Sequence, residues 1–137
     1  MRYLAIDHGT KRMGIAVSDE MKVIAQPLEY IPAEPAPRCF ARIQEIIAEK
    51  EVELILVGMP RNMDGTYGPA AQKVQEFIDA LRLSTSLPVQ AIDERLTSVQ
   101  ANRVLIAARV RRAERKQKVD PMAAAILLQA YLDARPA

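Results

Sequence analysis

The sequence contains no tryptophan, two phenylalanines, one histidine and one cysteine. A single cysteine excludes an internal disulfide, and one cysteine with one histidine cannot assemble a zinc site. We expect Cys39 to be a small, buried, apolar residue in a reducing compartment. No apolar run approaches the ~20 residues that a membrane-spanning helix needs. The N-terminus also has no signal-peptide pattern, so the sequence predicts a cytoplasmic protein that does not contact a membrane.

The chain has 137 residues, of which 50% are hydrophobic, and this predicts one domain over residues 1–137. The net charge is only +2, but the basic residues are unevenly distributed. Residues 95–118 contain one acid and eight basic residues: Arg95, Arg103, Arg109, Arg111, Arg112, Arg115, Lys116 and Lys118. This segment favours a polyanionic partner such as nucleic acid, although a solvated charged loop would have the same composition.

Hydrophobic periodicity predicts the order β-β-β-α-β-α-β-α-α. The expected strands are residues 3–7, 13–18, 24–31, 52–58 and 89–92, and the expected helices begin at residues 38, 69, 97 and 120. Pro27 indicates an edge position or a bulge in the third strand. Asp120 and Pro121 are typical of an N-cap followed by the first helical residue.

This order predicts an α/β fold of RNase H-like type. Three antiparallel strands form a meander, and right-handed crossovers add two parallel strands beside the first one. The result is a mixed five-stranded sheet with a central first strand and helices on both faces. In such sheets, functional sites lie at the carboxyl ends of the parallel strands.

Three acids fall at that edge. Asp7 ends the first strand, Glu94 follows the fifth, and Asp120 starts the last helix. At roughly 5 Å and an effective dielectric constant of about 20, each carboxylate pair costs on the order of 3 kcal/mol. Mg²⁺ or Mn²⁺ would relieve this repulsion and could activate a phosphodiester for hydrolysis. The sequence therefore predicts a metal-dependent nuclease with these three residues as metal ligands and catalytic groups.

Each acid also has a structural interpretation. Asp7 could begin a turn, Glu94 could pair with Arg95, and Asp120 could be only a helix cap. Other polar residues near this edge are more typical of turns than of catalysis: His8, Asp64 and Asp93.

Four segments together resemble the YqgF/RuvX family. They are DHGTKRMGIAVSD at residues 7–19, VGMPRNMDGT at 57–66, DERLTS at 93–98 and DPMAAAILLQ at 120–129. The resemblance covers nearly the whole chain. It implies an RNase H-like fold, and an activity described either as maturation of the 5′ end of pre-16S rRNA or as Holliday junction resolution.

By resemblance, Asp7, Glu94 and Asp120 occupy the metal-binding catalytic positions of the family. In better-known resolvases of this fold the second acid follows the fourth strand, whereas that strand ends here in Gly58, Met59 and Pro60 and Glu94 substitutes for it. Seven basic residues are expected to contact phosphates: Lys11, Arg12, Arg61, Arg95, Arg111, Arg112 and Arg115.

Two other functions remain open at this point. Residues 7–10 also resemble the phosphate loop of actin-like and sugar-kinase ATPases, although those proteins use two lobes and are far longer. The chain could also be a non-catalytic nucleic-acid-binding module or a ribosome-associated factor. The sequence does not choose between precursor rRNA and branched DNA, or between a monomer and a homodimer.

Overall fold

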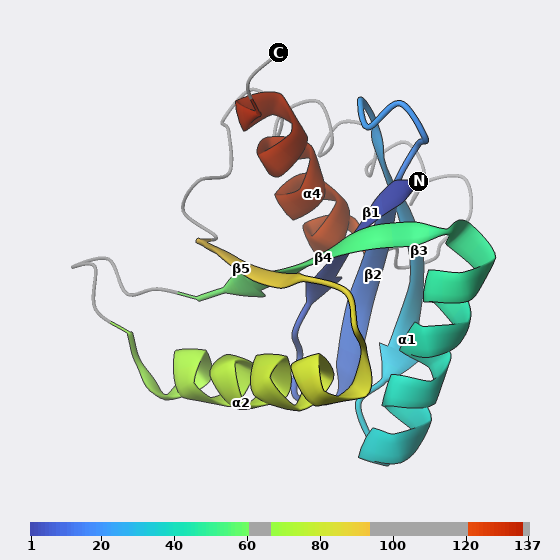
Figure 1. Cartoon of the computed structure of the whole chain (residues 1–137). Coiled ribbons are helices and arrows are strands. Elements are labelled where there is room, and N and C mark those ends of the chain that lie inside the picture. Colours follow the sequence, from blue (N-terminus) through green and yellow to red (C-terminus); the bar gives the residue numbers. More distant parts are fainter. Residues whose placement is uncertain (61–66, 94–120, 136–137) are drawn as a thin grey trace, which may run out of the picture.

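A computed structural model describes residues 1–60, 67–93 and 121–135 (Figure 1). The strands are β1 (Arg2–Asp7), β2 (Arg12–Ser18), β3 (Ala25–Pro32), β4 (Val52–Met59) and β5 (Val89–Asp93). The helices are α1 (Ala36–Lys50), α2 (Pro69–Ser84) and α4 (Met122–Ala134). None of the helices within these residues is long and apolar enough to cross a membrane.

The five strands form one sheet in the order β3-β2-β1-β4-β5. β2 pairs antiparallel with β1 and β3, whereas β4 runs parallel to both β1 and β5. The predicted mixed sheet with a central first strand is therefore confirmed. As a result, β1, β4 and β5 end at the same edge, at Asp7, Met59 and Asp93.

Helices cover both faces of the sheet, as predicted (Figure 1). On one face, α1 and α2 bury large aliphatic and aromatic residues against alternate strand positions such as Leu4 and Ile6. On the other face, α4 packs on the intervening position Ala5, and on Ala16 of β2. This alternation follows from the two-residue period of a strand.

The sequence also predicted local features of the elements. β3 is an edge strand whose register shifts near Pro27, so the proline marks both an edge and a bulge. Cys39 is buried, and α2 buries the expected stripe: Ala71, Val74, Phe77, Ile78 and Leu81.

The predicted start of the last helix is wrong by one residue. α4 begins at Met122, and Pro121 takes the N-cap position that we had predicted for Asp120. With φ −73° and ψ 58°, Pro121 is not helical, and its carbonyl accepts a hydrogen bond from Ala125 N. Pro121 itself has no side-chain group that could cap the first turn of α4. The helix predicted from residue 97 and the basic stretch that follows it lie outside the described residues.

Candidate active site

Asp7 is the last residue of the central strand and lies at the carboxyl edge of the sheet. Its side chain is half-buried, and within the described residues its carboxylate makes no hydrogen bond or ion pair. Burial raises the pKa of Asp7 above its ordinary value, because removal from water disfavours the charged form. A cation at this position would restore the favourable electrostatics that burial removes.

Gly14 allows α4 to approach Asp7. The two residues are partners in the β1–β2 ladder, so they share the sheet face that α4 covers. A Cβ atom added to Gly14 would lie 3.3 Å from the Cβ of Pro121 and 3.6 Å from the Cβ of Asp7. Pro121, which directly follows Asp120 in the chain, therefore packs closely on Gly14, the residue paired with Asp7 in the ladder.

The end of β5 extends the same edge. Asp93 is paired with Met59 of β4, and the chain continues directly into Glu94. Because β4 lies between β1 and β5, the ends of the two outer strands are roughly 10 Å apart at about 4.8 Å per strand. Asp93 itself is half-buried and already engaged by a neighbouring group.

Two of the predicted phosphate contacts are within the described residues. Lys11 is exposed in the β1–β2 turn, and Arg12 is exposed at the start of β2. The guanidinium carbon of Arg12 lies 3.9 Å from the centre of the Tyr30 ring. Tyr30 is the β3 partner of Gly14, and its ring also borders that glycine. This cation–π contact holds the charge of Arg12 near the edge where Asp7 ends.

Gly9 makes the β1–β2 turn possible. A Cβ atom at this position would collide with the backbone carbonyl oxygen of Arg12. The turn therefore needs glycine because of this close backbone approach. It brings Lys11 and Arg12 back to the edge that Asp7 occupies.

His8 faces the opposite side of the sheet from Asp7. Its ring lies 5.2 Å from that of Phe77, which in turn stacks on Phe40. Burial lowers the pKa of His8, and the nearby positive charge of Lys73 lowers it further. His8 thus packs as an aromatic residue against Phe77 of α2, and its interpretation as a turn residue stays a prediction.

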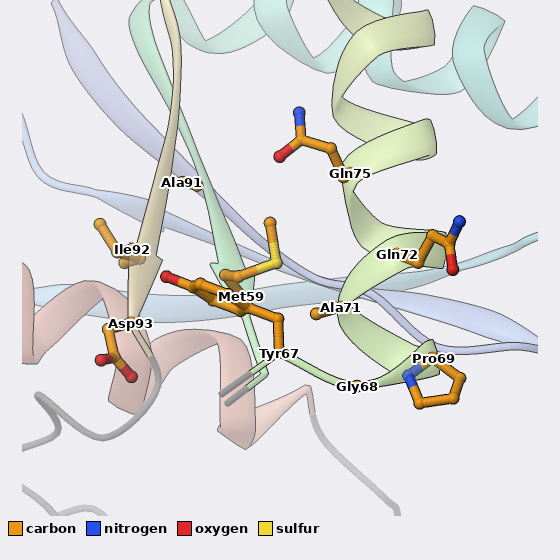
Figure 2. A pocket seen from close by; sticks show the side chains of 10 residues that line it. All are labelled: Met59, Tyr67, Gly68, Pro69, Ala71, Gln72, Gln75, Ala91, Ile92 and Asp93. Carbon is orange, nitrogen blue, oxygen red and sulfur yellow. The ribbon is translucent and has the colours of Figure 1, made fainter. Parts of the chain in front are cut away.

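A cavity of about 740 Å³ opens at the same edge, between the start of α2 and the ends of β4 and β5 (Figure 2). Among the lining residues that the structure describes there is no lysine or arginine, and Asp93 supplies the single charged side chain. Met59, Tyr67 and Ile92 supply apolar surface, and Gln72 and Gln75 supply amide groups. The carboxyl edge of the sheet therefore carries this largely apolar cavity at the ends of β4 and β5, and Asp7 at the end of β1.

Most predicted site residues lie outside the described ranges. They are Glu94, Asp120, Arg61, Arg95, Arg111, Arg112 and Arg115, and Asp64, which we interpreted as a turn residue, lies outside them as well. Within residues 1–60, 67–93 and 121–135, no three side chains of the metal-binding types form a cluster. The structure brings the neighbours of Glu94 and Asp120 to the edge at Asp7, and the three-carboxylate site itself stays a prediction.

Sequence reasoning did not single out Gly14, Tyr30 or Lys73. For Gly14 a signal existed, because a glycine inside an apolar strand indicates a close approach by another segment. For Tyr30, the alternation of β3 could have placed the ring on one face, but not beside Arg12. Lys73 occupies an ordinary exposed position of a helix, and no sequence pattern distinguishes it.

Comparison with known proteins places the chain in a family. The family model described as "RuvX: Holliday junction resolvase" matches residues 1–134. The chain belongs to this family.

A relative from Symbiobacterium thermophilum is 47% identical over 137 residues, covering 100% of this chain and 95% of its own length. A relative from a Geobacillus strain is 48% identical, covering 98% of this chain and 99% of its own. Both carry the name "Putative pre-16S rRNA nuclease".

Solved structures confirm the fold of this RuvX family member. RuvC of T. thermophilus, in a complex with a Holliday junction substrate, matches with a TM-score of 0.60 at 18% identity, covering 95% of this chain and 90% of its own. The fowlpox virus Holliday junction resolvase matches with a TM-score of 0.59 at 14% identity, covering 98% and 100%. The predicted RNase H-like fold and the predicted class of enzyme, a nuclease, are thus confirmed, and family membership disfavours the ATPase hypothesis.

Proposed function

We propose that the chain is a metal-dependent endonuclease that processes the 5′ end of pre-16S rRNA in the cytoplasm. Support for the substrate comes from relatives of that name, which are 46–48% identical over at least 96% of this chain. The observation that carries the mechanism is the half-buried carboxylate of Asp7, unpaired among the described residues at the carboxyl edge.

Asp7, Glu94 and Asp120 would hold the divalent cation, Mg²⁺ or Mn²⁺. The oxygen donors fit a hard cation, and the raised pKa of Asp7 indicates a position where positive charge is favourable. The bound metal would stabilise the attacking and leaving oxygens of an in-line displacement at phosphorus. Close packing of Pro121 on Gly14 supports a location of Asp120 beside Asp7.

The basic residues of the chain would position the nucleic-acid backbone. Arg12, held over Tyr30, and the exposed Lys11 would contact phosphates next to the scissile bond. We assign the same role to the arginines at positions 61, 95, 111, 112 and 115. Such contacts carry no base information, so the specificity of cleavage would come from the shape of the substrate.

The test is cleavage of a pre-16S rRNA 5′ fragment with millimolar Mg²⁺ or Mn²⁺. The wild-type chain should release the mature 5′ end, and Asp7→Asn should abolish cleavage because it keeps the shape but loses the charge. Circular dichroism and thermal melting should show that this variant is folded. A folded Asp7→Asn variant with full activity would refute the site.

Holliday junction resolution is the second candidate, favoured by the family description. A resolvase makes symmetric cuts and needs two active sites, so this function predicts a homodimer. A four-way DNA junction is therefore the second substrate, assayed beside the rRNA fragment, with the molar mass measured by light scattering. Symmetric junction cleavage by a dimer, without rRNA cleavage, would replace our proposal with this one.

A further inference from the structure

A second, smaller cavity lies near the end of β1, on the sheet face that α2 covers. It has a volume of about 230 Å³ and is lined by His8, Thr10, Pro60, Ala70, Lys73 and Val74. The residues come from the β1–β2 turn, the end of β4 and the first two turns of α2. The space would hold several water molecules at about 30 Å³ each, enough for an anionic group with part of its hydration.

The charges around this cavity favour an anion. Among the described residues that line it, Lys73 is the one lysine or arginine, and none carries a carboxylate. Lys73 is exposed, and among the described residues its ammonium group makes no ion pair. Thr10 is also exposed and adds a hydroxyl that can donate a hydrogen bond. The described lining of the larger cavity in Figure 2 includes no lysine or arginine, so the described linings of the two cavities differ in charge.

The position of the cavity relates it to Asp7. His8, which lines the cavity, directly follows Asp7, and the two side chains face opposite sides of the sheet. Pro60 directly follows β4, the strand beside β1. A nucleic-acid strand that crosses the edge at Asp7 would therefore pass from the α4 side to the opening between Thr10 and Lys73.

We propose that the cavity between Thr10 and Lys73 binds a backbone phosphate that neighbours the scissile phosphate. The proposal rests on the nuclease function proposed above. Lysine binds phosphate as a mobile point charge, and a threonine hydroxyl completes the contact with a hydrogen bond. Lys73 is in this sense a positioning residue, because it fixes the register of the strand without touching the reacting atoms.

The experiment measures binding separately from cleavage. All variants are made in the Asp7→Asn background, and the probe is a fluorescein-labelled pre-16S rRNA 5′ fragment followed by fluorescence anisotropy at several salt concentrations. Lys73→Gln should weaken binding about fivefold or more, and should lower the slope of log affinity against log salt by roughly 0.7 to 0.9. Lys73→Arg should restore both, since it keeps the charge.

Lys50→Gln is the matched control. Lys50 ends α1 just before β4 begins, at the other end of the sheet from Asp7, so its loss should leave the affinity and the salt slope unchanged. Equal effects of Lys50→Gln and Lys73→Gln, or a Lys73→Gln variant with wild-type affinity and slope, would overturn the phosphate site. Failure of the proposed function would appear differently. The protein with an intact Asp7 would then cleave neither the rRNA fragment nor the DNA junction, while the binding results would be unchanged.

Discussion

The two faces of the sheet are built from side chains of different size. The face under α4 is rich in alanine: Ala5, Ala16 and Ala25 from the strands meet Ala124 and Ala125 of the helix. The face under α1 and α2 is filled by leucine, isoleucine, valine and phenylalanine. Small residues let a helix backbone approach a sheet, whereas large ones bury more apolar area and stabilise the fold in proportion.

The difference in side-chain size indicates different roles for the two faces of the sheet. At the carboxyl edge, Gly14 continues the small-residue face. Gly14 is the ladder partner of Asp7, and its lack of a side chain lets Pro121 pack closely on it. The small residues under α4 therefore determine how closely the start of this helix can approach Asp7. The opposite face buries the larger cluster of apolar side chains, and its edge carries the cavity with Lys73.

Gly14→Val should break the close approach. The added Cβ would lie 3.3 Å from the Cβ of Pro121, and its methyl groups would force α4 away from β2. We expect a loss of about 100-fold in kcat/KM, since displacements near 1 Å in a site cost about that much. Overpacking should also reduce the free energy of unfolding by about 1–3 kcal/mol. Gly14→Ala should give an intermediate loss, and a fully active Gly14→Val would show that the approach does not matter.

Ile43→Ala tests the other face. Ile43 of α1 is fully buried in the large-residue core, so its truncation should lower the free energy of unfolding by about 2–5 kcal/mol. Urea denaturation measures this loss. Well below the melting temperature, cleavage should stay within about twofold of wild type, because Ile43 lies in the core and lines neither cavity at the carboxyl edge. A loss of activity as large as that of Gly14→Val would contradict the separation of the two faces.

The sequence predicted the fold well because strand and helix periodicity determine which residues are buried. The stripe of α2 followed from the helical spacing of its apolar residues, and Pro27 indicated an edge position or a bulge in β3, both of which the structure has. The start of α4 was predicted one residue early, because Asp and Pro are good residues for both the N-cap and the position after it. Such a shift by one residue changes which group caps the helix but not the fold.

The site could be predicted only in part. The position of Asp7 at the carboxyl edge could be predicted because strand order determines which strand ends share an edge, whereas its role as a metal ligand stays a prediction. The contact of Arg12 with Tyr30 and the cavity beside Lys73 depend on side-chain directions between elements distant in sequence. Periodicity carries no information about such contacts, so the sequence could not have indicated them.

A divalent metal ion that binds at Asp7, on the sheet face covered by α4, should stabilise the folded protein. A ligand that binds only the native state adds about 2.7 kcal/mol to stability at 100 times its dissociation constant. Mg²⁺ or Mn²⁺ at millimolar concentration should therefore raise the melting temperature in calorimetry. Asp7→Asn should abolish this shift, whereas Ile43→Ala should retain it from a lower starting temperature. An equal shift in Asp7→Asn and wild type would mean that the metal binds elsewhere.

The smallest expected effect concerns Cys39, to which we assign no role at the site. The rate at which its thiol is modified reports how often the core under α1 opens. The thiol is 2% exposed, and burial raises its pKa, so access and thiolate formation are both restricted. At pH 8 the native protein should react with a thiol reagent at least about 10³-fold more slowly than the protein in denaturant, since reaction requires opening of the core. Ile43→Ala should speed the reaction, because residues 39 and 43 lie on the same side of α1 one turn apart.

The pH dependence of this thiol has a definite sign. Because the pKa of Cys39 is raised in the native state, the unfolded state loses the thiol proton first as pH rises. The contribution of this thiol to the free energy of unfolding is therefore complete below the pKa of the unfolded thiol, and it declines as pH rises through the native pKa. Unfolding measured between pH 7 and 10 should show this decline, and Cys39→Ala should remove that part of it. Rapid modification of Cys39 in the native protein at pH 8 would show that the large-residue face opens locally, and the contrast between a stabilising face and a positioning face would then fail.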